Sequence, residues 1–382
     1  MSYDFDRIVP RRGTDSLKYD FAAERGMPPG LLPMWVADMD FPAPPEVLAD
    51  IAETAAHGIF GYTEPKAPYY DAVAEWFGGR YGYRPPREAI VKAPGVVFAL
   101  AQAVRAFTAP GDAVLIQTPV YYPFYDIVRR NGRTLATNPL TRTDGAYTID
   151  FDDFERKASE NAVKAFILCN PHNPVGRVWT RGELIRLRDI CAKNGILVLS
   201  DEIHCDFVWG GREHVCYAAL SKDAFIATAP SKTFNLAGLQ VSNVFIENAS
   251  LRRRFRDETA SAGYSQLNTV GLRAALSAYE KGGPWLAELK AYLEGNIRAA
   301  RYFIAECLPK VTLIEPEGTY LLWLDFSAYG LTQAELDRRV TAAGLWLDSG
   351  TMFGAEGEGF QRVNAACPRS VLLEGLRRLG EV

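Results

Sequence analysis

Short apolar runs alternate with helical segments over about residues 60 to 275, and this alternation restricts the possible folds more than any other feature of the sequence. Strands separated by helices of roughly 10–14 residues form a mostly parallel sheet with helices on both faces. The expected strands are Ala113–Gln117, Arg133–Thr137, Lys164–Cys169, Ile196–Ser200, Phe225–Thr228 and Val241–Ile246. The expected helices run from a turn at Ala93–Val97 to Phe107, and over Tyr121–Asn131, Asp150–Glu160 and Thr180–Lys193. The sequence therefore predicts an α/β fold.

The remainder of the chain predicts a second, smaller domain. Residues 1–60 are expected to form an irregular N-terminal arm and part of the small domain, and residues 61–283 the large domain that contains the sheet. Residues 284–382 are expected to form a linker helix, at Pro284–Pro309, and the C-terminal α+β part of the small domain. Two domains fit a chain of 382 residues.

Charge and cysteine usage argue against several classes of partner. The formal net charge of −4 provides no basic field, so we expect neither nucleic acid nor an anionic membrane as a partner. The sequence has no run of about 18 apolar residues, and its first residues, MSYDFDRIVPRR, lack the apolar stretch of a signal peptide. The six cysteines are scattered without a CxxC pair, which is typical of reduced cytoplasmic proteins. We therefore expect a cytoplasmic protein.

Three polar residues follow expected strands, and the carboxyl ends of such strands are where open α/β sheets bind ligands. Asn173 lies in the turn CNPHNPVG, Asp201 ends the run ILVLSD, and Lys232 follows the strand Phe225–Thr228. Lysines are mostly exposed, so Lys232 taken alone is more readily explained as a solvated loop residue. Together the three suit a phosphorylated pyridine aldehyde. The amine would bond to the aldehyde, the carboxylate would pair with the ring nitrogen, and the amide would donate to the ring hydroxyl.

The phosphate of such a ligand would lie at a helix N-terminus. Gly95 and Val96 open the helix that ends at Phe107, and free N–H groups behind a glycine form an anion site. Ser231, next to the candidate lysine, would complete the phosphate contacts. Any strand-to-helix turn resembles this pattern, so it supports the ligand only in combination with the other three residues.

A metal centre is the alternative interpretation of the acidic and histidine residues in this region. Asp201, Glu202, His204, Asp206 and His214 are close in sequence, and catalytic zinc needs three such ligands. Alternation along a strand, however, points Asp201 and Glu202 in opposite directions, and the sequence has no HxH or HxxxH pair. We therefore expect no metal.

Four motifs, in order along the chain, resemble those of the fold-type I pyridoxal-phosphate enzymes, the aspartate aminotransferase superfamily. They are NPHNPVGR (Asn170–Arg177), SDEIH (Ser200–His204), SKTFNLAGLQ (Ser231–Gln240) and QRVNAACPR (Gln361–Arg369). The resemblance spans nearly the whole chain. It implies a seven-stranded, mostly parallel sheet with one antiparallel strand, and pyridoxal 5'-phosphate as the cofactor bound to Lys232.

A narrower resemblance links the chain to the MalY/PatB-type cystathionine β-lyases, also called cysteine C–S lyases. It rests on PMWVADMDF (Pro33–Phe41), GYT (Gly61–Thr63), PGVV (Pro94–Val97), PVYYPF (Pro119–Phe124) and a histidine at position 204. The resemblance implies that Tyr122 stacks on the pyridine ring and that Arg362 binds the substrate α-carboxylate. It also implies that Tyr62 reaches the phosphate of the neighbouring subunit, in a homodimer with composite sites. The remaining implied contacts are Val97 to the cofactor, His204 lining the cofactor or lying just behind it, and Trp35, Ala37 and Asp38 to the substrate.

One departure from the subgroup concerns the substrate. Where the subgroup often has a proline–glycine pair, this chain has Leu347-Asp348-Ser349-Gly350, and the additional carboxylate is expected near the substrate mouth. We expect a lyase that cleaves L-cystathionine or a related cysteine S-conjugate to a thiol, pyruvate and ammonia. An aminotransferase shares every cofactor contact and is the first alternative. A non-enzymatic binding or regulatory protein on the same fold is the second.

Overall fold

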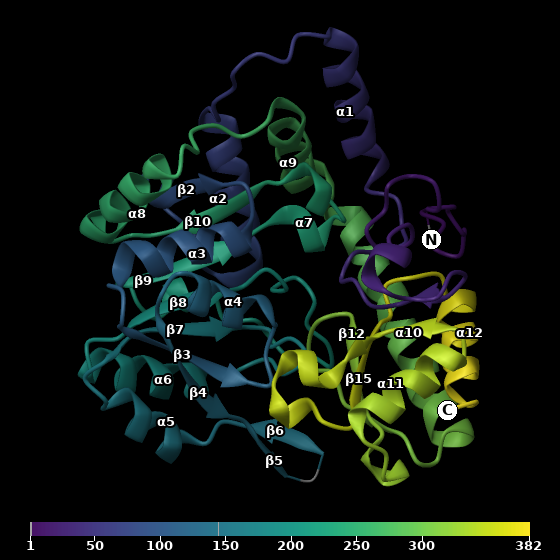
Figure 1. Ribbon diagram of the computed structural model, residues 1–382. Coiled ribbons are helices and arrows are strands. Elements are labelled where there is room, and N and C mark those ends of the chain that lie inside the picture. Colours follow the sequence, from purple (N-terminus) through teal and green to yellow (C-terminus); the bar gives the residue numbers. More distant parts are fainter. Residues whose placement is uncertain (1, 144) are drawn as a thin grey trace.

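A seven-stranded sheet forms the centre of the large domain in the computed structural model, which describes residues 2–143 and 145–382 (Figure 1). Its strands, in spatial order, are β2 (Ile90–Ala93), β10 (Ser242–Phe245), β9 (Ala224–Thr228), β8 (Leu197–Asp201), β7 (Val163–Cys169), β3 (Ala113–Thr118) and β4 (Thr134–Pro139). Strand β10 runs antiparallel to both of its neighbours, and every pair from β9 to β4 is parallel. The predicted fold, a mostly parallel sheet with one antiparallel strand, is confirmed.

Two boundaries differ from the sequence analysis in ways that matter for the site. The edge strand β2 was missed, because its four residues are few and Lys92 interrupts its apolar run. The helix expected at Tyr121–Asn131 is α4 (Pro123–Arg130), which begins later because Pro123 occupies its first position. Tyr121 therefore lies outside the helix.

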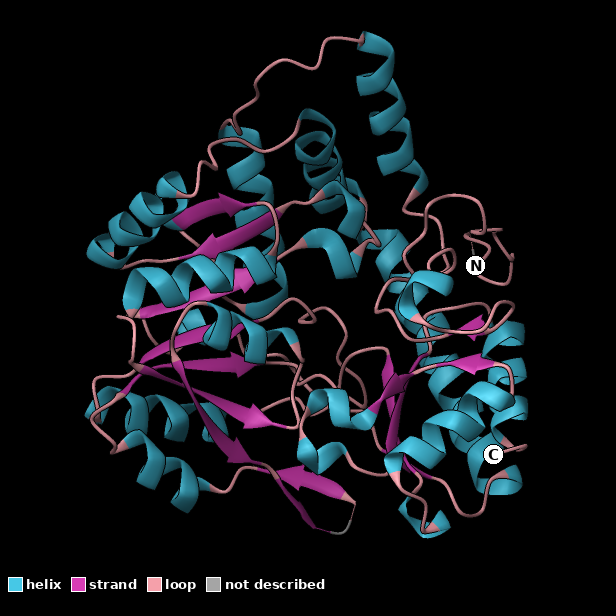
Figure 2. Cartoon of the chain, in the orientation of Figure 1, coloured by secondary structure: helices cyan, strands magenta, loops and turns pink. Residues whose placement is uncertain are grey.

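Helices cover both faces of this sheet, as Figure 2 shows. One face carries α3 (Val96–Phe107), α4 and α8 (Ala249–Ser261), and the other carries α2 (Ala67–Tyr81), α5 (Phe151–Ala158), α6 (Arg181–Lys193) and α9 (Thr269–Lys281). Side chains alternate between the two apolar cores along each strand. In β3, Val114 and Ile116 belong to the first core and Leu115 to the second. Burial on both faces explains why the strands read as continuous apolar runs.

A second sheet, with four antiparallel strands, forms the centre of the smaller domain. Its strands in spatial order are β11 (Thr312–Ile314), β12 (Leu321–Asp325), β15 (Phe360–Asn364) and β14 (Asp348–Ser349). The helices α10 (Gly283–Cys307), α11 (Gln333–Ala342) and α12 (Arg369–Leu379) accompany it. Figure 1 shows the N-terminal arm beside α10 and α12, where β1 (Leu32–Pro33) pairs in parallel with β13 (Leu345–Trp346).

Helix α1 (Pro45–His57) and a two-stranded ribbon lie at the periphery. The helix packs on α9, and β5 (Thr141–Thr143) pairs with β6 (Ala146–Thr148) in the antiparallel ribbon. Across the described part of the chain, no helix combines the length and the apolar character needed to cross a bilayer.

Candidate active site

A cavity of about 470 Å³ lies at the carboxyl ends of β7, β8 and β9. Nine residues selected from the sequence line it: Ala37, Gly95, Val96, Val97, Asn173, Asp201, His204, Ser231 and Lys232. They come from five separate parts of the chain, so the fold brings together groups that are up to about two hundred residues apart. Five other selected residues do not line it: Trp35, Asp38, Tyr62, Tyr122 and Arg362.

Lys232 lies on the short helix α7 (Pro230–Thr233), directly after β9. Its Nζ donates a hydrogen bond to the Ala37 carbonyl at 2.6 Å. Burial lowers the pKa of the amine to about 8, while the Asp38 carboxylate opposes this shift and the Arg362 guanidinium adds to it. An amine with this pKa is partly neutral near physiological pH, so it can act as a nucleophile or accept a proton.

Asp201 ends β8 inside the cavity and is 4% exposed. Burial raises the pKa of its carboxyl to about 7. The hydrogen bond from the Ile203 N–H and the charge of Lys232 both act to lower this pKa. The next residue, Glu202, points away from the cavity, and its Oε2 lies 2.8 Å from His214 Nε2. The opposite orientation expected for these two carboxylates is therefore observed. A buried carboxyl with a raised pKa is stabilised in its ionised form by a cationic ligand.

Tyr121 lines the cavity, whereas Tyr122, which the sequence analysis selected to stack on the pyridine ring, does not. Tyr122 immediately precedes α4, and its ring packs against Phe353 with 6.0 Å between centroids. Burial raises the pKa of the Tyr121 hydroxyl, and Arg362 and Asp201 are near enough to act on it. The two rings lie beside each other, with 5.3 Å between centroids, and of the two only the Tyr121 ring lines the cavity.

The N-terminal segment Met34–Asp40 contributes backbone atoms where the sequence analysis expected side chains. The Ala37 carbonyl, which accepts from Lys232, also accepts from the Tyr320 hydroxyl at 3.0 Å. The Trp35 carbonyl accepts from Arg362 at 2.9 Å. The Trp35 indole instead stacks on Trp346, with 4.6 Å between ring centroids. Trp35 therefore does not present its side chain to the cavity.

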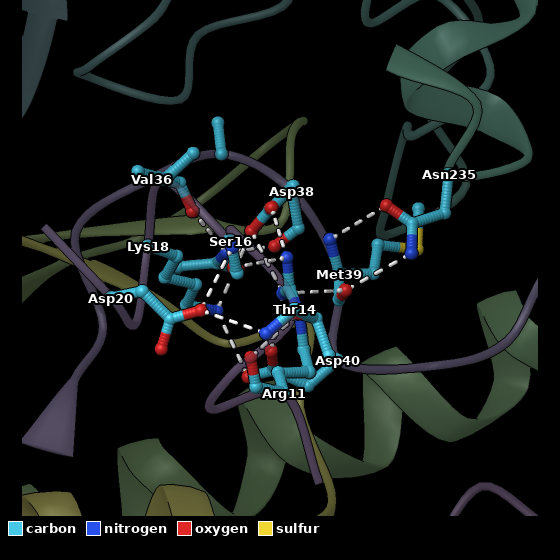
Figure 3. A network of polar contacts seen from close by, with 12 residues as sticks. Arg11, Thr14, Ser16, Lys18, Asp20, Val36, Asp38, Met39, Asp40 and Asn235 are labelled. Carbon is cyan, nitrogen blue, oxygen red and sulfur yellow. Dashed lines mark hydrogen bonds and ion pairs between the residues drawn. The ribbon is translucent and has the colours of Figure 1, made fainter. Parts of the chain in front are cut away.

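Asp38 is held away from the cavity by a network of four charged side chains, drawn in Figure 3. Arg11 pairs with Asp38 at 2.6 Å and with Asp40 at 2.7 Å. Lys18, which is 1% exposed, pairs with Asp40 at 2.9 Å. The Asp38 carboxylate can therefore influence the pKa of Lys232, but it is not free to bind a substrate directly.

Asn235, which the sequence analysis did not single out, holds the N-terminal segment in place. Its side chain accepts from the Met39 N–H and donates to the Met39 carbonyl, both at 3.0 Å (Figure 3). It also donates to the Phe41 carbonyl at 2.8 Å. Its φ of +57° is one that asparagine tolerates better than most residues. Because Asn235 follows Lys232 by three residues, it ties the N-terminal segment to the lysine's own loop.

Arg362 lies on β15, one layer behind the cavity wall. Its Nη1 donates to Asn173 Oδ1 at 2.9 Å, and Asn173 itself lines the cavity. Its guanidinium lies over the Phe353 ring, 4.8 Å from the centroid, and pairs with the Asp348 carboxylate. The arginine is therefore oriented by the cavity wall on one side and by a carboxylate on the other.

His204 lines the cavity, as one of the two expectations for it required. Burial lowers the pKa of the imidazole, and the charges of Lys232 and Arg362 lower it further, so the ring is neutral. Its edge approaches the Tyr320 ring, with 5.8 Å between centroids. Among residues 2–143 and 145–382, no group of three or more His, Cys, Asp or Glu side chains is arranged to hold a metal ion.

The donor set fits a phosphorylated pyridine aldehyde. Lys232 supplies the amine for the aldehyde, Asp201 a buried carboxyl for the ring nitrogen, and Asn173 an amide for the ring hydroxyl. The residues that would hold the phosphate are Gly95, Val96, Val97 and Ser231. Gly95 is the N-cap of α3, and no side chain caps this helix, so its first N–H groups are available to an anion.

Comparisons with known proteins identify the family. Residues 31–379 match the family Aminotransferase class I and II. The chain is similar to the cystathionine beta-lyase PatB of Bacillus subtilis (strain 168), with 48% identity over 381 residues that cover 98% of each chain. It is also similar to the structure of cystalysin from Treponema denticola, which contains a pyridoxal 5'-phosphate cofactor. The identity is 36% and the TM-score 0.96, with 100% of this chain and 98% of that chain covered.

A third similarity is to the pyridoxal-phosphate-bound C–S lyase from Staphylococcus hominis, with 34% identity, a TM-score of 0.93, and 100% of this chain and 98% of that chain covered. These findings confirm pyridoxal 5'-phosphate as the cofactor. With a match over most of its length and a site that fits this cofactor, the chain belongs to the aminotransferase class I and II family of pyridoxal-phosphate enzymes.

Proposed function

We propose that the protein is a carbon–sulfur β-lyase that converts L-cystathionine, or a related cysteine S-conjugate, to a thiol, pyruvate and ammonia. The observation that carries this proposal is the Lys232 amine, which lies in the cavity with a pKa of about 8. Such an amine accepts protons near neutral pH, and α,β-elimination begins with removal of the Cα proton. The similarity to the cystathionine beta-lyase PatB supports the substrate class.

The side chains divide the work of elimination between them. The bound cofactor supplies an electron sink for the charge that develops at the substrate Cα. Lys232 takes the Cα proton, and the Ala37 carbonyl, 2.6 Å from Nζ, orients the resulting ammonium. Asp201 is the carboxylate that would pair with the ring nitrogen, and its negative charge would favour the electron sink. The sulfur then leaves Cβ with the bonding electron pair, and the Lys232 ammonium is a proton source for the departing thiolate.

Arg362 is the group we assign to the substrate α-carboxylate. A guanidinium matches a carboxylate in geometry as well as charge. The hydrogen bond between Arg362 Nη1 and Asn173 Oδ1 links the guanidinium to the cavity wall. The ring of Tyr121, which lines the same cavity, is the one we assign to stacking on the pyridine.

The test is an assay of pyruvate and free thiol with L-cystathionine as the only added reactant. Sustained release of both products in equal amounts is expected, and Lys232→Ala is expected to release neither. Absence of both products from a protein that has bound the cofactor would refute the lyase assignment.

Transamination is the second candidate, because the matched family is described as Aminotransferase class I and II. It shares the cofactor contacts and the removal of the Cα proton, and differs only in where that proton is returned. The same assay separates the two reactions. An aminotransferase would release no thiol and would turn over only after a keto acid is added.

We also propose a homodimer with composite sites. Tyr62 is 95% exposed, and the neighbouring Ile59 and Phe60 are 70% and 60% exposed. Val97, which lines the cavity, is 41% exposed. Adjacent exposed apolar side chains are typical of an interaction surface. A second copy of the chain that covered this surface would bring Tyr62 to the phosphate of its neighbour.

A further inference from the structure

Arg362, which the proposed function assigns to the substrate carboxylate, already has a carboxylate partner. Asp348 lies directly opposite Arg362 in the β14–β15 pair. The Asp348 Oδ2 accepts from Arg362 Nη2, and both side chains are 3% exposed. Within the described residues, the carboxylate has no hydrogen bond to any other group. Arg362 is therefore the group that keeps this buried carboxylate ionised.

The guanidinium retains donors for a second anion. It has five N–H donors, and three of its hydrogen bonds go to Asp348, Asn173 and the Trp35 carbonyl. The buried Nε has no hydrogen-bond partner among the described residues. An unpaired buried N–H of a charged group is costly, so a ligand that supplies an acceptor there is favoured.

A substrate carboxylate that binds Arg362 brings a second negative charge to one cation. Two carboxylates that share a site cannot both ionise freely, because each raises the pKa of the other. Unless Asp348 is neutralised, the repulsion is large enough to weaken binding by about ten-fold or more. A proton taken up by Asp348 removes the repulsion and leaves Arg362 to the substrate.

We propose that Asp348 is a resident carboxylate that competes with the substrate α-carboxylate for Arg362, so that binding of an amino acid takes up one proton at Asp348. The proposal rests on the assignment of Arg362 in the proposed function. It makes Asp348 a specificity-determining residue, because Asp348 does not affect the affinity for ligands that lack a carboxylate.

The surroundings of Asp348 favour this exchange. Burial raises the pKa of the carboxyl, which Arg362 and the Arg25 guanidinium on η1 (Ala23–Arg25) oppose. Tyr121 and Tyr122 face it from the turn before α4, and burial raises the pKa of both hydroxyls. The tyrosines therefore stay neutral, and Asp348 is the group in this cluster whose protonation accompanies binding near neutral pH.

The test measures proton uptake by calorimetric titration of the holoenzyme with L-alanine, in two buffers of different ionisation enthalpy, from pH 6 to pH 9. We expect the wild type to take up about one proton more per site than Asp348→Asn at the upper end of this range. We expect Asp348→Asn to bind L-alanine about ten-fold more tightly there, with the difference shrinking as the pH falls. Asp348→Glu, which keeps the charge, should retain the uptake. Ser349→Ala, at the next position of β14, removes hydroxyl contacts to Asp337 and Thr351 but no charge, and should match the wild type.

Ethylamine, which is L-alanine without its carboxylate, distinguishes the possible causes. The affinity for ethylamine should not differ between the wild type and Asp348→Asn. In the wild type, but not in Asp348→Asn, fewer protons should be taken up with ethylamine than with L-alanine. Weaker binding of L-alanine by Asp348→Asn, or an equal gain for both ligands, would overturn the proposal. Because no turnover is measured, a protein that binds L-alanine in this way but never cleaves L-cystathionine would refute the proposed function alone.

Discussion

The replacement Asp201→Asn is expected to stabilise the protein freed of its cofactor and to weaken it as an enzyme. Burial raises the pKa of the Asp201 carboxyl from 3.8 to about 7 in the folded chain. Between these values the folded state binds a proton that the unfolded state has lost, so stability falls as the pH rises. The difference of about 3 units, at 1.36 kcal/mol each, amounts to about 4 kcal/mol lost by pH 8. Asparagine has no charge to desolvate and avoids this loss.

The assay is thermal unfolding of the cofactor-free wild type and Asp201→Asn at pH 5 and pH 8. For a chain of 382 residues, about 4 kcal/mol corresponds to a difference in Tm of about 5 °C at pH 8. At pH 5 the difference in Tm should be less than half as large, because this pH is only about one unit above the pKa of the carboxyl in the unfolded chain. Adding pyridoxal phosphate should raise the Tm of the wild type more than that of the variant, since Asp201 then gains a cationic partner.

Glu202→Gln is the matched control, because it removes a buried carboxylate from the next residue. Glu202 accepts from Ser200 Oγ at 2.9 Å and from the Tyr217 N–H at 2.8 Å, and it lies 2.8 Å from His214. Breaking this hydrogen-bonded cluster should cost about 3 kcal/mol at pH 8, the opposite sign to Asp201→Asn. The reasoning fails if Asp201→Asn melts below the wild type at pH 8, or if the gap between them does not change with pH.

Three further outcomes follow from the site. The kcat for elimination should rise with pH and level off above about 8, because Lys232 must be neutral to take the Cα proton. Asp38→Asn removes a charge that raises the pKa of Lys232, so its kcat profile should rise at lower pH, and an unchanged midpoint would contradict the assignment. Mixing Tyr62→Phe with Lys232→Ala should restore about a quarter of the wild-type activity if each site uses both subunits. Activity no higher than that of the parent variants would refute composite sites.

The positions of Lys232, Asp201 and Asn173 could be predicted from the sequence because parallel strands end at one edge of a sheet. Each residue lies at the end of an apolar run or within four residues of it, the runs had to be buried on both faces, and the topology then places the strand ends together. The orientation of a side chain within a turn has no such constraint. Tyr121 and Tyr122 occupy adjacent positions before α4, and only the path of the backbone decides which ring reaches the cavity.

The contacts of the N-terminal segment could not be predicted at all, because they are made by carbonyl groups, which every residue possesses. The Trp35 carbonyl binds Arg362 of the small domain, and the Ala37 carbonyl, two residues on, binds Lys232 of the large domain. Asn364 donates to the carbonyls on either side of Ala37, each at 2.6 Å. One short, bent stretch of backbone therefore fixes the distance between the proton acceptor and the group assigned to the substrate carboxylate. This stretch is conspicuous in the sequence for its acidic and aromatic side chains, which anchor it from outside. Its peptide groups contact Lys232 and Arg362.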